Sequence, residues 1–431
     1  MRVLVTGAYG FIGSHIVAAL AAAGHEVVCA VRRGRLDSRF PGTRAIACDM
    51  ARDITPDAWL PRLDGIDAVV NCAGILRECG EDRFEAVHVR APLALFEASA
   101  CAGVHRVVQV SALGRIDDGE FIASKHRCDE QLATLGLSAT ILRPALVYSA
   151  RGSYGGSSLL RAMAALPAII PVPRMALRPC VQPIAAEDLA MAVVAALSHP
   201  PIGVETLDVV GPEPMGLGEY LQRWRRWLGL PQARVWIVPA TLVRIACRLG
   251  ERLGHGPLGE TMQRMLEHGH VGPPQALPLM RSRLGLVPRT LERALAEVPG
   301  HEQDLWHARL YFALPLMRIS MALLWLASGV VGWSLSPDAV DAAAPGGFLS
   351  RGAGLIVARI TASADLLLGA LCLLRWRPRW VMAGMLVMLL GYTIGIGTLW
   401  PLHWLDPLGG LLKNLPLMAV LVLLLATEEK R

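Results

Sequence analysis

Lysine is nearly absent from this chain of 431 residues: of its 42 basic residues 39 are arginine, and the three lysines are Lys125, Lys413 and Lys430. No run rich in Lys and Arg reaches the length of a nucleic-acid patch, so the net charge of +6 predicts no nucleic-acid partner. Where Arg is the default cation, a Lys either survives codon bias by chance or marks a place that needs a compact ammonium group.

The pattern of a disulfide framework is also missing, and no cleavable leader is expected. The nine cysteines are scattered singly and no C-x-x-C occurs, which indicates a reducing compartment rather than a disulfide framework. His88, His105 and His126 have no spacing that predicts a metal site or a catalytic triad, and we expect no metal. The chain opens on Arg2–Thr6 and a glycine turn instead of the apolar stretch of a signal peptide.

Charge is scarce in the last part of the chain. Of the 117 residues from 310 to 426, 11 are charged, against 67 of the other 314. Soluble domains have about 25% charged residues. The composition therefore predicts a soluble body followed by a membrane domain, and it disfavours a disordered chain, a collagen-like chain and a wholly soluble enzyme.

The N-terminal body begins with the pattern of a nucleotide cradle. Arg2–Thr6 predicts a buried strand, Gly7-Ala8-Tyr9-Gly10-Phe11-Ile12-Gly13 forms a glycine turn, and Ser14–Ala23 is helix-forming. The glycines let the backbone approach a pyrophosphate, and the helix N-terminus offers free N–H groups. A tight structural turn is the alternative, but the context on both sides favours nucleotide binding.

Strands and helices alternate after the cradle. Further strands are expected at 25–31, 44–48, 67–71, 104–110 and 138–142, with helices at about 83–102 and 121–135. This order predicts an α/β fold, a Rossmann-like doubly wound parallel sheet with its ligand at the carboxyl ends of the strands. Within this first domain, residues 1–300, the segment 145–300 is expected to form a small substrate lobe that includes a strand at 204–210. In that lobe, Trp224-Arg225-Arg226-Trp227 fits either a membrane interface or a packed helix with a basic outer face.

Residues at the ends of the second and third predicted strands bear on the cofactor. Arg32 and Arg33 suit a 2′-phosphate, where an acidic residue would instead bind the ribose 2′-hydroxyl. NADP is therefore expected, and Asp37 lies close enough to keep NAD as the alternative. Asp49, at the end of the third strand, is a further candidate for cofactor binding.

Several of these segments together resemble a known family. The cradle, Asn71-Cys72-Ala73-Gly74, Val110-Ser111-Ala112-Leu113-Gly114, Ser124-Lys125 and Leu142–Tyr148 resemble the extended and atypical short-chain dehydrogenase/reductases. The Ser-Ala-Leu-Gly segment is most similar to the branch that contains the NADPH-binding accessory subunit of respiratory complex I. The resemblance covers about residues 1–300 and implies a cofactor site built from Gly7, Tyr9, Gly10, Phe11, Ile12, Gly13, Arg32, Arg33, Asp49, Asn71, Ala73, Gly74 and Lys125.

The resemblance also implies a catalytic Tyr-x-x-x-Lys pair. In that family the Tyr hydroxyl transfers a proton, the Lys holds the nicotinamide ribose and lowers the tyrosine pKa, and a Ser orients the carbonyl. Lys125 matches the Lys and Ser111 begins the serine segment, but Phe121 occupies the Tyr position and has no proton to give. We therefore expect the fold and the cofactor site of the family without its usual mechanism.

Four apolar segments follow, at about 310–333, 352–374, 380–400 and 408–426, each long enough for the ~20 residues of a spanning helix. Tryptophans cluster at their ends. The excess of arginine on the side of the N-terminal body predicts a multi-pass protein of the inner (cytoplasmic) membrane with both termini in the cytoplasm. Asp406–Pro416 resembles the DoxX-like family, which implies an all-α four-helix transmembrane domain at 308–427.

Charged residues inside the apolar segments need partners. Arg318 and Asp365 are expected at a similar depth, roughly 12–14 Å from the helix ends, and we expect them to pair across helices because isolated charges in a bilayer are costly. Arg359 and Lys413 are expected nearer the far side, where they could snorkel or meet an anionic headgroup or a quinone.

Two functions fit this organisation. The first is a membrane-anchored, NADP-binding reductase that acts on a membrane lipid, a quinone or another lipid-soluble substrate. The second is a non-catalytic NADP-binding redox sensor, or an assembly or structural partner in a membrane complex. A transporter regulated by its N-terminal body is a third interpretation.

Overall fold

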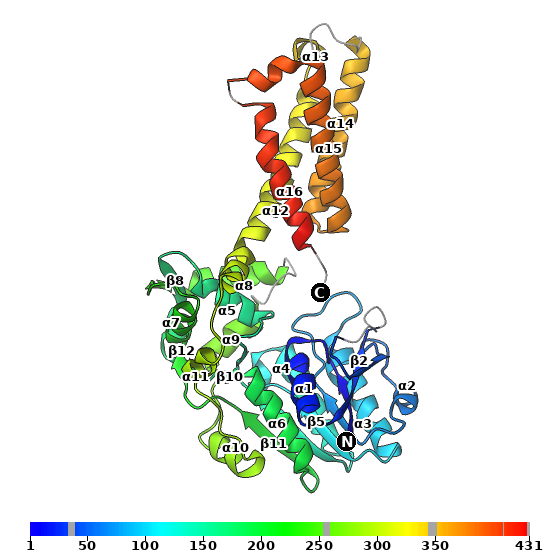
Figure 1. Cartoon of the computed structure of the whole chain (residues 1–431), viewed down its shortest axis with the longest axis vertical. Coiled ribbons are helices and arrows are strands. Elements are labelled where there is room, and N and C mark those ends of the chain that lie inside the picture. Colours follow the sequence, from blue (N-terminus) through cyan, green and yellow to red (C-terminus); the bar gives the residue numbers. More distant parts are fainter. Residues whose placement is uncertain (33–38, 253–258, 344–350, 408, 429–431) are drawn as a thin grey trace. The chain divides into compact units, whose positions relative to one another are not determined.

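The computed structural model describes residues 1–32, 39–252, 259–343, 351–407 and 409–428. The chain forms two compact units, Met1–Ala308 and Arg309–Arg431. The bounds of the elements in each unit follow, and Figure 1 shows their course.

A seven-stranded parallel sheet is the centre of the first unit, and it confirms the predicted Rossmann-like fold. Its strand order is β11-β6-β5-β4-β1-β2-β3. Every neighbouring pair is parallel. The strands are β1 (Arg2–Thr6), β2 (Glu26–Val31), β3 (Arg44–Ala47), β4 (Ala68–Asn71), β5 (Arg106–Val110), β6 (Ser138–Pro144) and β11 (Val204–Val209).

Helices cover both faces of this sheet. Val3 and Val5 of β1 point toward one face, where they pack with α1 (Phe11–Ala22), α6 (Ala186–Ser198) and α10 (Ala276–Leu284). Leu4 points toward the other face, where it packs with α2 (Pro56–Trp59), α3 (Ala91–Cys101) and α4 (Glu120–Leu132). This alternation follows from the period of two in a strand, and continuous apolar runs are typical of parallel strands buried on both faces.

The strand predicted at 204–210 belongs to the main sheet and not to the substrate lobe. As β11 it pairs in parallel with β6, so that Val209 lies opposite Pro144. Helix α6 makes the crossover between the two strands, and buried Leu207 and Val209 join the core beneath it. A right-handed crossover through a helix is the usual connection of parallel neighbours, and it moves the strand out of the lobe.

A smaller lobe has its own apolar core. It contains α5 (Gly156–Ala164), α7 (Leu217–Trp227), α8 (Ala240–Arg252), α9 (Glu260–His268), α11 (Leu291–Ala296) and three two-stranded pairs, β7 (Val147–Tyr148) with β10 (Ile184–Ala185), β9 (Pro179–Val181) with β12 (Met215–Gly216), and β8 (Ile169–Pro173) with β13 (Arg234–Val238). Trp224 and Arg225 of α7 are buried. Arg225 donates to the carbonyls of Ala164 and Leu166. The Trp-Arg-Arg-Trp segment is therefore a packed helix.

Apolar helices make up the second unit. In the part of the chain that the structure describes, three helices are long and apolar enough to cross a membrane: α12 (Glu302–Ser334), α14 (Arg351–Leu373) and α15 (Pro378–Leu399). The fourth predicted span differs, because α16 (Asn414–Thr427) follows two 3₁₀ turns and is shorter than the ~20 residues that a bilayer requires. A short helix α13 (Pro337–Ala343) precedes α14.

The expected pair between Arg318 and Asp365 is wrong. Arg318 forms an ion pair with Glu428, just beyond the end of α16. Asp365 is buried, where it accepts hydrogen bonds from Ser328 (2.8 Å) and Tyr392 (3.1 Å). Depth along a helix axis does not determine the direction in which a side chain points around that axis, and the two residues found different partners. Arg359 lies over the ring of Trp333 and donates to the carbonyl of Leu335.

Candidate nucleotide-binding site

Two glycines of the turn between β1 and α1, Gly7 and Gly13, have no space for a side chain. Gly7 has φ +66°, and a Cβ there would lie 2.7 Å from the Cys72 carbonyl oxygen and 2.8 Å from the Ala73 Cα. A Cβ on Gly13 would lie 2.1 Å from the Gly7 carbonyl oxygen. Gly10 is the N-cap residue of α1, and it makes no side-chain hydrogen bond to the first N–H groups of the helix. A bare helix N-terminus beside a tightly packed turn fits a pyrophosphate.

Buried polar side chains join the carboxyl ends of three neighbouring strands. The Thr6 hydroxyl donates to Asn71 Oδ1, and Asn71 Nδ2 donates to Gln109 Oε1 at 2.7 Å. The Ala73 amide also donates to Asn71 Oδ1 at 3.3 Å, which directs the Asn71–Gly74 segment past the cradle. Asn71 was predicted from the sequence, whereas Thr6 and Gln109 were not, although all three are polar residues at or near the ends of apolar strands.

Lys125 lies beside Gly74, and the fold thus brings these two predicted residues together. Its Nζ donates to the Val110 carbonyl at 3.1 Å, and a Cβ on Gly74 would lie 3.4 Å from the same atom. Burial lowers the pKa of the Lys125 ammonium, and the carboxylate of Asp129 on the next turn of α4 opposes that shift. The ammonium is therefore held at the carboxyl edge of the sheet, on the side where the cradle opens.

Phe121 packs against the imidazole of His88, a residue that was not predicted to lie in the site. The His88 ring centroid is 5.6 Å from that of Phe121 and 5.2 Å from that of Phe84. His88 Nε2 accepts from the Ile75 amide (3.0 Å), so Nδ1 carries the proton and donates to Ser124 Oγ (2.8 Å). Burial, and then the charge of Lys125, lowers the pKa of His88 to about 2, which keeps the ring neutral.

The hydroxyl of Ser111 points toward α4. It donates to Asp129 Oδ2 at 2.7 Å, and Arg143 Nε donates to the same oxygen at 2.9 Å. Burial raises the pKa of Asp129, while the bonds from Ser111 and Arg143 oppose that shift. The catalytic role of Ser111 stays a prediction, because its one hydroxyl proton is used in this buried network.

The candidates for the adenosine side of the cofactor lie just after the carboxyl ends of β1, β2 and β3. Arg32 Nη2 donates to Asp82 at 2.7 Å, and this hydrogen bond raises the pKa of the Arg32 guanidinium. The Tyr9 hydroxyl accepts from the Arg39 amide at 3.1 Å, and the Arg39 guanidinium lies over the Tyr9 ring. Asp49 Oδ1 accepts from the Ala51 amide. Arg33 and Asp37 lie outside the described residues.

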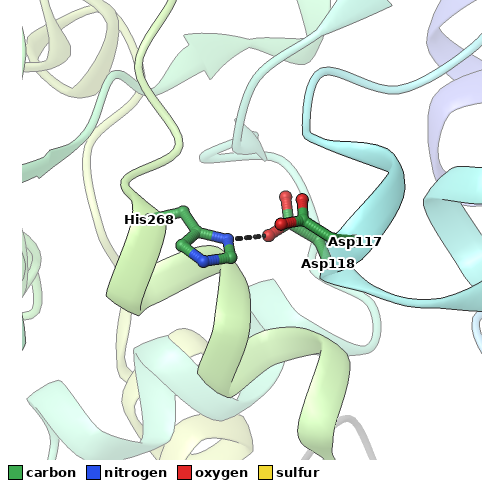
Figure 2. Close-up of side chains that lie close together, drawn as sticks. All are labelled: Asp117, Asp118 and His268. Carbon is green, nitrogen blue, oxygen red and sulfur yellow. Dashed lines mark hydrogen bonds and ion pairs between the residues drawn. The ribbon is translucent and has the colours of Figure 1, made fainter.

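Asp117, Asp118 and His268 form a separate cluster, with ligand-type atoms within 4.8 Å of one another. Figure 2 shows the His268 ring facing Asp118, and its Nδ1 lies 2.5 Å from Asp118 Oδ1. Asp118 Oδ2 accepts from the Arg115 amide at 2.7 Å. Both oxygens of the buried Asp118 thus have partners, and the cluster ties α9 of the lobe to the segment that leads into α4.

Comparison with known proteins agrees with this geometry. The model of the NAD dependent epimerase/dehydratase family matches residues 3–209, and that of the DoxX-like family matches residues 322–422. Ceramide reductase of Caulobacter vibrioides is 32% identical over 217 residues, which are 48% of this chain and 64% of that protein.

A second relative is (4-alkanoyl-5-oxo-2,5-dihydrofuran-3-yl)methyl phosphate reductase of Streptomyces griseus subsp. griseus. It is 30% identical over 233 residues, which are 53% of this chain and 74% of that protein. The solved structure of MoeE5 in complex with UDP-glucose and NAD matches with a TM-score of 0.50 and 22% identity, over 72% of this chain and 100% of that chain, and so shares the fold. This chain belongs to the NAD-dependent epimerase/dehydratase family, as an atypical short-chain dehydrogenase/reductase with a C-terminal DoxX-like domain.

Proposed function

We propose that this protein is a membrane-anchored, NADP-dependent reductase of a quinone or another lipid-soluble carbonyl compound, with its nucleotide-binding domain on the cytoplasmic side. The observation that carries the proposal is the presence, in one chain, of a nucleotide cradle with a buried lysine and of three helices that can cross a membrane. An enzyme fixed to a bilayer has preferential access to apolar substrates.

Different residues of the site would bind different parts of the cofactor. The turn from Gly7 to Gly13 and the N-terminus of α1 would bind the pyrophosphate, and Arg32 would bind the 2′-phosphate. The Asn71–Gly74 segment and Lys125 would hold the nicotinamide ribose. When bound, NADPH supplies the hydride, and the site must supply a proton to the carbonyl oxygen.

Lys125 supports such a proton transfer better than its neighbours do. Phe121 has no ionisable proton, and His88 stays neutral with both ring nitrogens hydrogen-bonded. Burial makes the Lys125 ammonium a stronger acid than an exposed lysine, and it lies at the same strand edge as Gly74. In this proposal the Lys125 ammonium gives its proton to the substrate oxygen and regains one from water.

The relatives support a lipid substrate to a limited extent. The name ceramide reductase gives one of them a lipid substrate, and this chain spans 64% of that protein's length. The finer resemblance to the complex I accessory-subunit branch, seen in the Ser-Ala-Leu-Gly segment, adds a quinone-associated membrane setting as an expectation.

The test measures NADPH oxidation by the full chain in lipid nanodiscs with short-chain quinones and with a ceramide-type keto lipid. We expect turnover that Lys125→Met abolishes while NADPH binding weakens. Phe121→Tyr restores the proton donor that is usual in the family and should raise the rate. If the natural chain and Phe121→Tyr both bind NADPH tightly and neither turns over, the reductase proposal is refuted.

Phe121 itself favours the second candidate, a non-catalytic NADP-binding sensor or membrane-complex component. Its ring packs against His88 and Phe84, so it fills the position with apolar contacts. Binding without turnover, together with a partner protein retained on affinity purification in NADPH and released in NADP⁺, would support this candidate over the reductase.

A further inference from the structure

Helix α8 of the substrate lobe has two apolar faces, of which only one is packed. Cys247 is buried, and α8 packs against α9. On the other side Leu242, Ile245 and Leu249 are 48%, 61% and 55% exposed. Spacings of three, four and seven residues place these three side chains on one stripe of the helix.

The strand before α8 extends the same exposed apolar surface. In the described residues β13 pairs with β8 alone, which leaves its other edge without a strand partner. Trp236 and Ile237 are about half exposed, and Pro239 joins the strand directly to α8. We define the β13–α8 surface as Trp236, Ile237, Leu242, Ile245 and Leu249 (α8 and β8, the strand that pairs with β13, are labelled in Figure 1).

Most of the charge along β13 and α8 is positive, and the acidic residue Glu251 lies at the end of α8. Arg234, Arg244 and Arg248 lie within or beside the β13–α8 surface, and residues 231–250 contain no Asp or Glu. Arg248 follows Ile245 by one helical turn, so its aliphatic stem can lie along the apolar stripe while its guanidinium reaches outward.

We propose that the β13–α8 surface docks on the face of a lipid bilayer that contains anionic lipids. An exposed apolar stripe on a helix with arginines on its polar side is the pattern of an interfacial helix, and Trp236 suits the headgroup level. The candidate spans begin in the same chain at α12, so a bilayer is present at high effective concentration. Anionic headgroups complement the arginines.

Helix α7, which precedes β13, shows why solvent exposure, and not composition, identifies the helix that could contact a bilayer. Its sequence, with Trp224 and Trp227 around two arginines, has the composition of an interfacial segment. Trp224 is nevertheless buried, where Arg161 lies over its ring at 4.5 Å from the centroid. Composition alone selects α7, whereas the solvent-exposed side chains select α8.

Photocrosslinking tests this proposal on the full chain in nanodiscs of phosphatidylcholine and phosphatidylglycerol. Benzoylphenylalanine replaces Ile245 in one variant and, as a matched control, Met191 of α6, which is 51% exposed. We expect lipid adducts, identified by mass spectrometry, to be at least roughly tenfold more abundant at position 245. Equal yields at both positions, no lipid adduct at 245, or adducts there only to residues 309–431 or to a second copy would overturn the proposal.

A charge reversal tests the lipid specificity. The double substitution Arg244→Glu and Arg248→Glu should lower the lipid-adduct yield at position 245 severalfold in nanodiscs with phosphatidylglycerol and should change it little in phosphatidylcholine alone. An unchanged yield in both would refute the role of anionic lipid. Neither readout needs turnover, so failure of the reductase proposal and failure of this one are distinguishable.

Discussion

Substitution of Gly7 by Ala tests the nucleotide cradle most directly, because the chain offers a matched control. Gly7 and Gly24 flank α1 and both have positive φ, +66° and +80°. A Cβ on Gly7 would lie 2.7–2.8 Å from the backbone of Cys72 and Ala73, whereas a Cβ on Gly24 would meet nothing within 4 Å. Gly24→Ala therefore measures the backbone strain alone, and Gly7→Ala adds the collision.

The magnitudes separate the two variants. An alanine in the left-handed region costs about 1–2 kcal/mol in either place, and forcing an extra methyl group into packed structure costs about 1–3 kcal/mol more. The backbone at Cys72 cannot yield without moving the Asn71–Gly74 segment, so the additional strain acts on the cofactor site. Since about 1.4 kcal/mol corresponds to a tenfold change in Kd, we expect Gly7→Ala to weaken NADPH binding roughly tenfold or more.

Isothermal titration of NADPH into the full chain in nanodiscs measures this difference. Gly24→Ala should keep the Kd within about a factor of two of the natural chain while its thermal transition falls, as local strain alone requires. Circular dichroism of Gly7→Ala establishes that the sheet still forms. Equal NADPH affinities for the two variants, with both folded, would refute the placement of the pyrophosphate at this turn.

Three further predictions concern the same unit. Arg32→Ala should raise the Kd for NADPH about tenfold and leave the Kd for NADH unchanged. A charge-assisted hydrogen bond contributes about 1.5–3 kcal/mol, and the competing bond of Arg32 to Asp82 reduces the net effect on binding. Equal changes in both Kd values would show that Arg32 does not bind the 2′-phosphate. Burial gives His88 a folded-state pKa of about 2, below its unfolded value of about 6.5, so the neutral ring has no free-energy cost above about pH 6.5. Below that pH the free energy of unfolding should fall by about 1.4 kcal/mol per pH unit. Thermal melts should show a shallower fall with pH for His88→Asn, and parallel curves for the two chains would contradict a buried, neutral His88. Ser111→Ala should lower stability by about 1–3 kcal/mol, because Asp129 loses a donor, and a lost kcat with an unchanged melt would instead support a catalytic serine.

The alternation of strands and helices was enough to predict the fold class, because apolar runs and glycine turns are local signals. The membership of β11 in the main sheet was not predictable in the same way. Its sequence indicates a strand, but the choice between pairing with β6 and pairing inside the lobe depends on where α6 packs. Such a choice involves contacts between residues far apart in the chain.

In the site, too, features set by the local sequence were predictable and features set by long-range contacts were not. The residues of the cradle and Lys125 were predicted because motifs fix their spacing along the chain. His88 was not placed there, because it reaches Ser124 and the Phe121 ring from a different helical segment, 33 residues or more away in sequence. For Arg318 and Asp365, counting residues gave a depth, while the rotation of each helix about its axis decided the partners.

The register of β6 and β11 has a mechanical consequence for the lobe. Pro144 and Val209 are partners in that pair, so the chain leaves the sheet twice at neighbouring points of its carboxyl edge. Between these exits it returns through Ala185 into α6, which packs on the sheet. The chain then crosses from α9 of the lobe to α10 on the sheet and back to α11, so that five chain crossings join the lobe to the sheet in the described residues. Together with the ion pair between Arg289 and Asp188, these connections restrict the movement of the lobe against the sheet. We therefore expect the substrate side of the site to keep its shape when the cofactor binds.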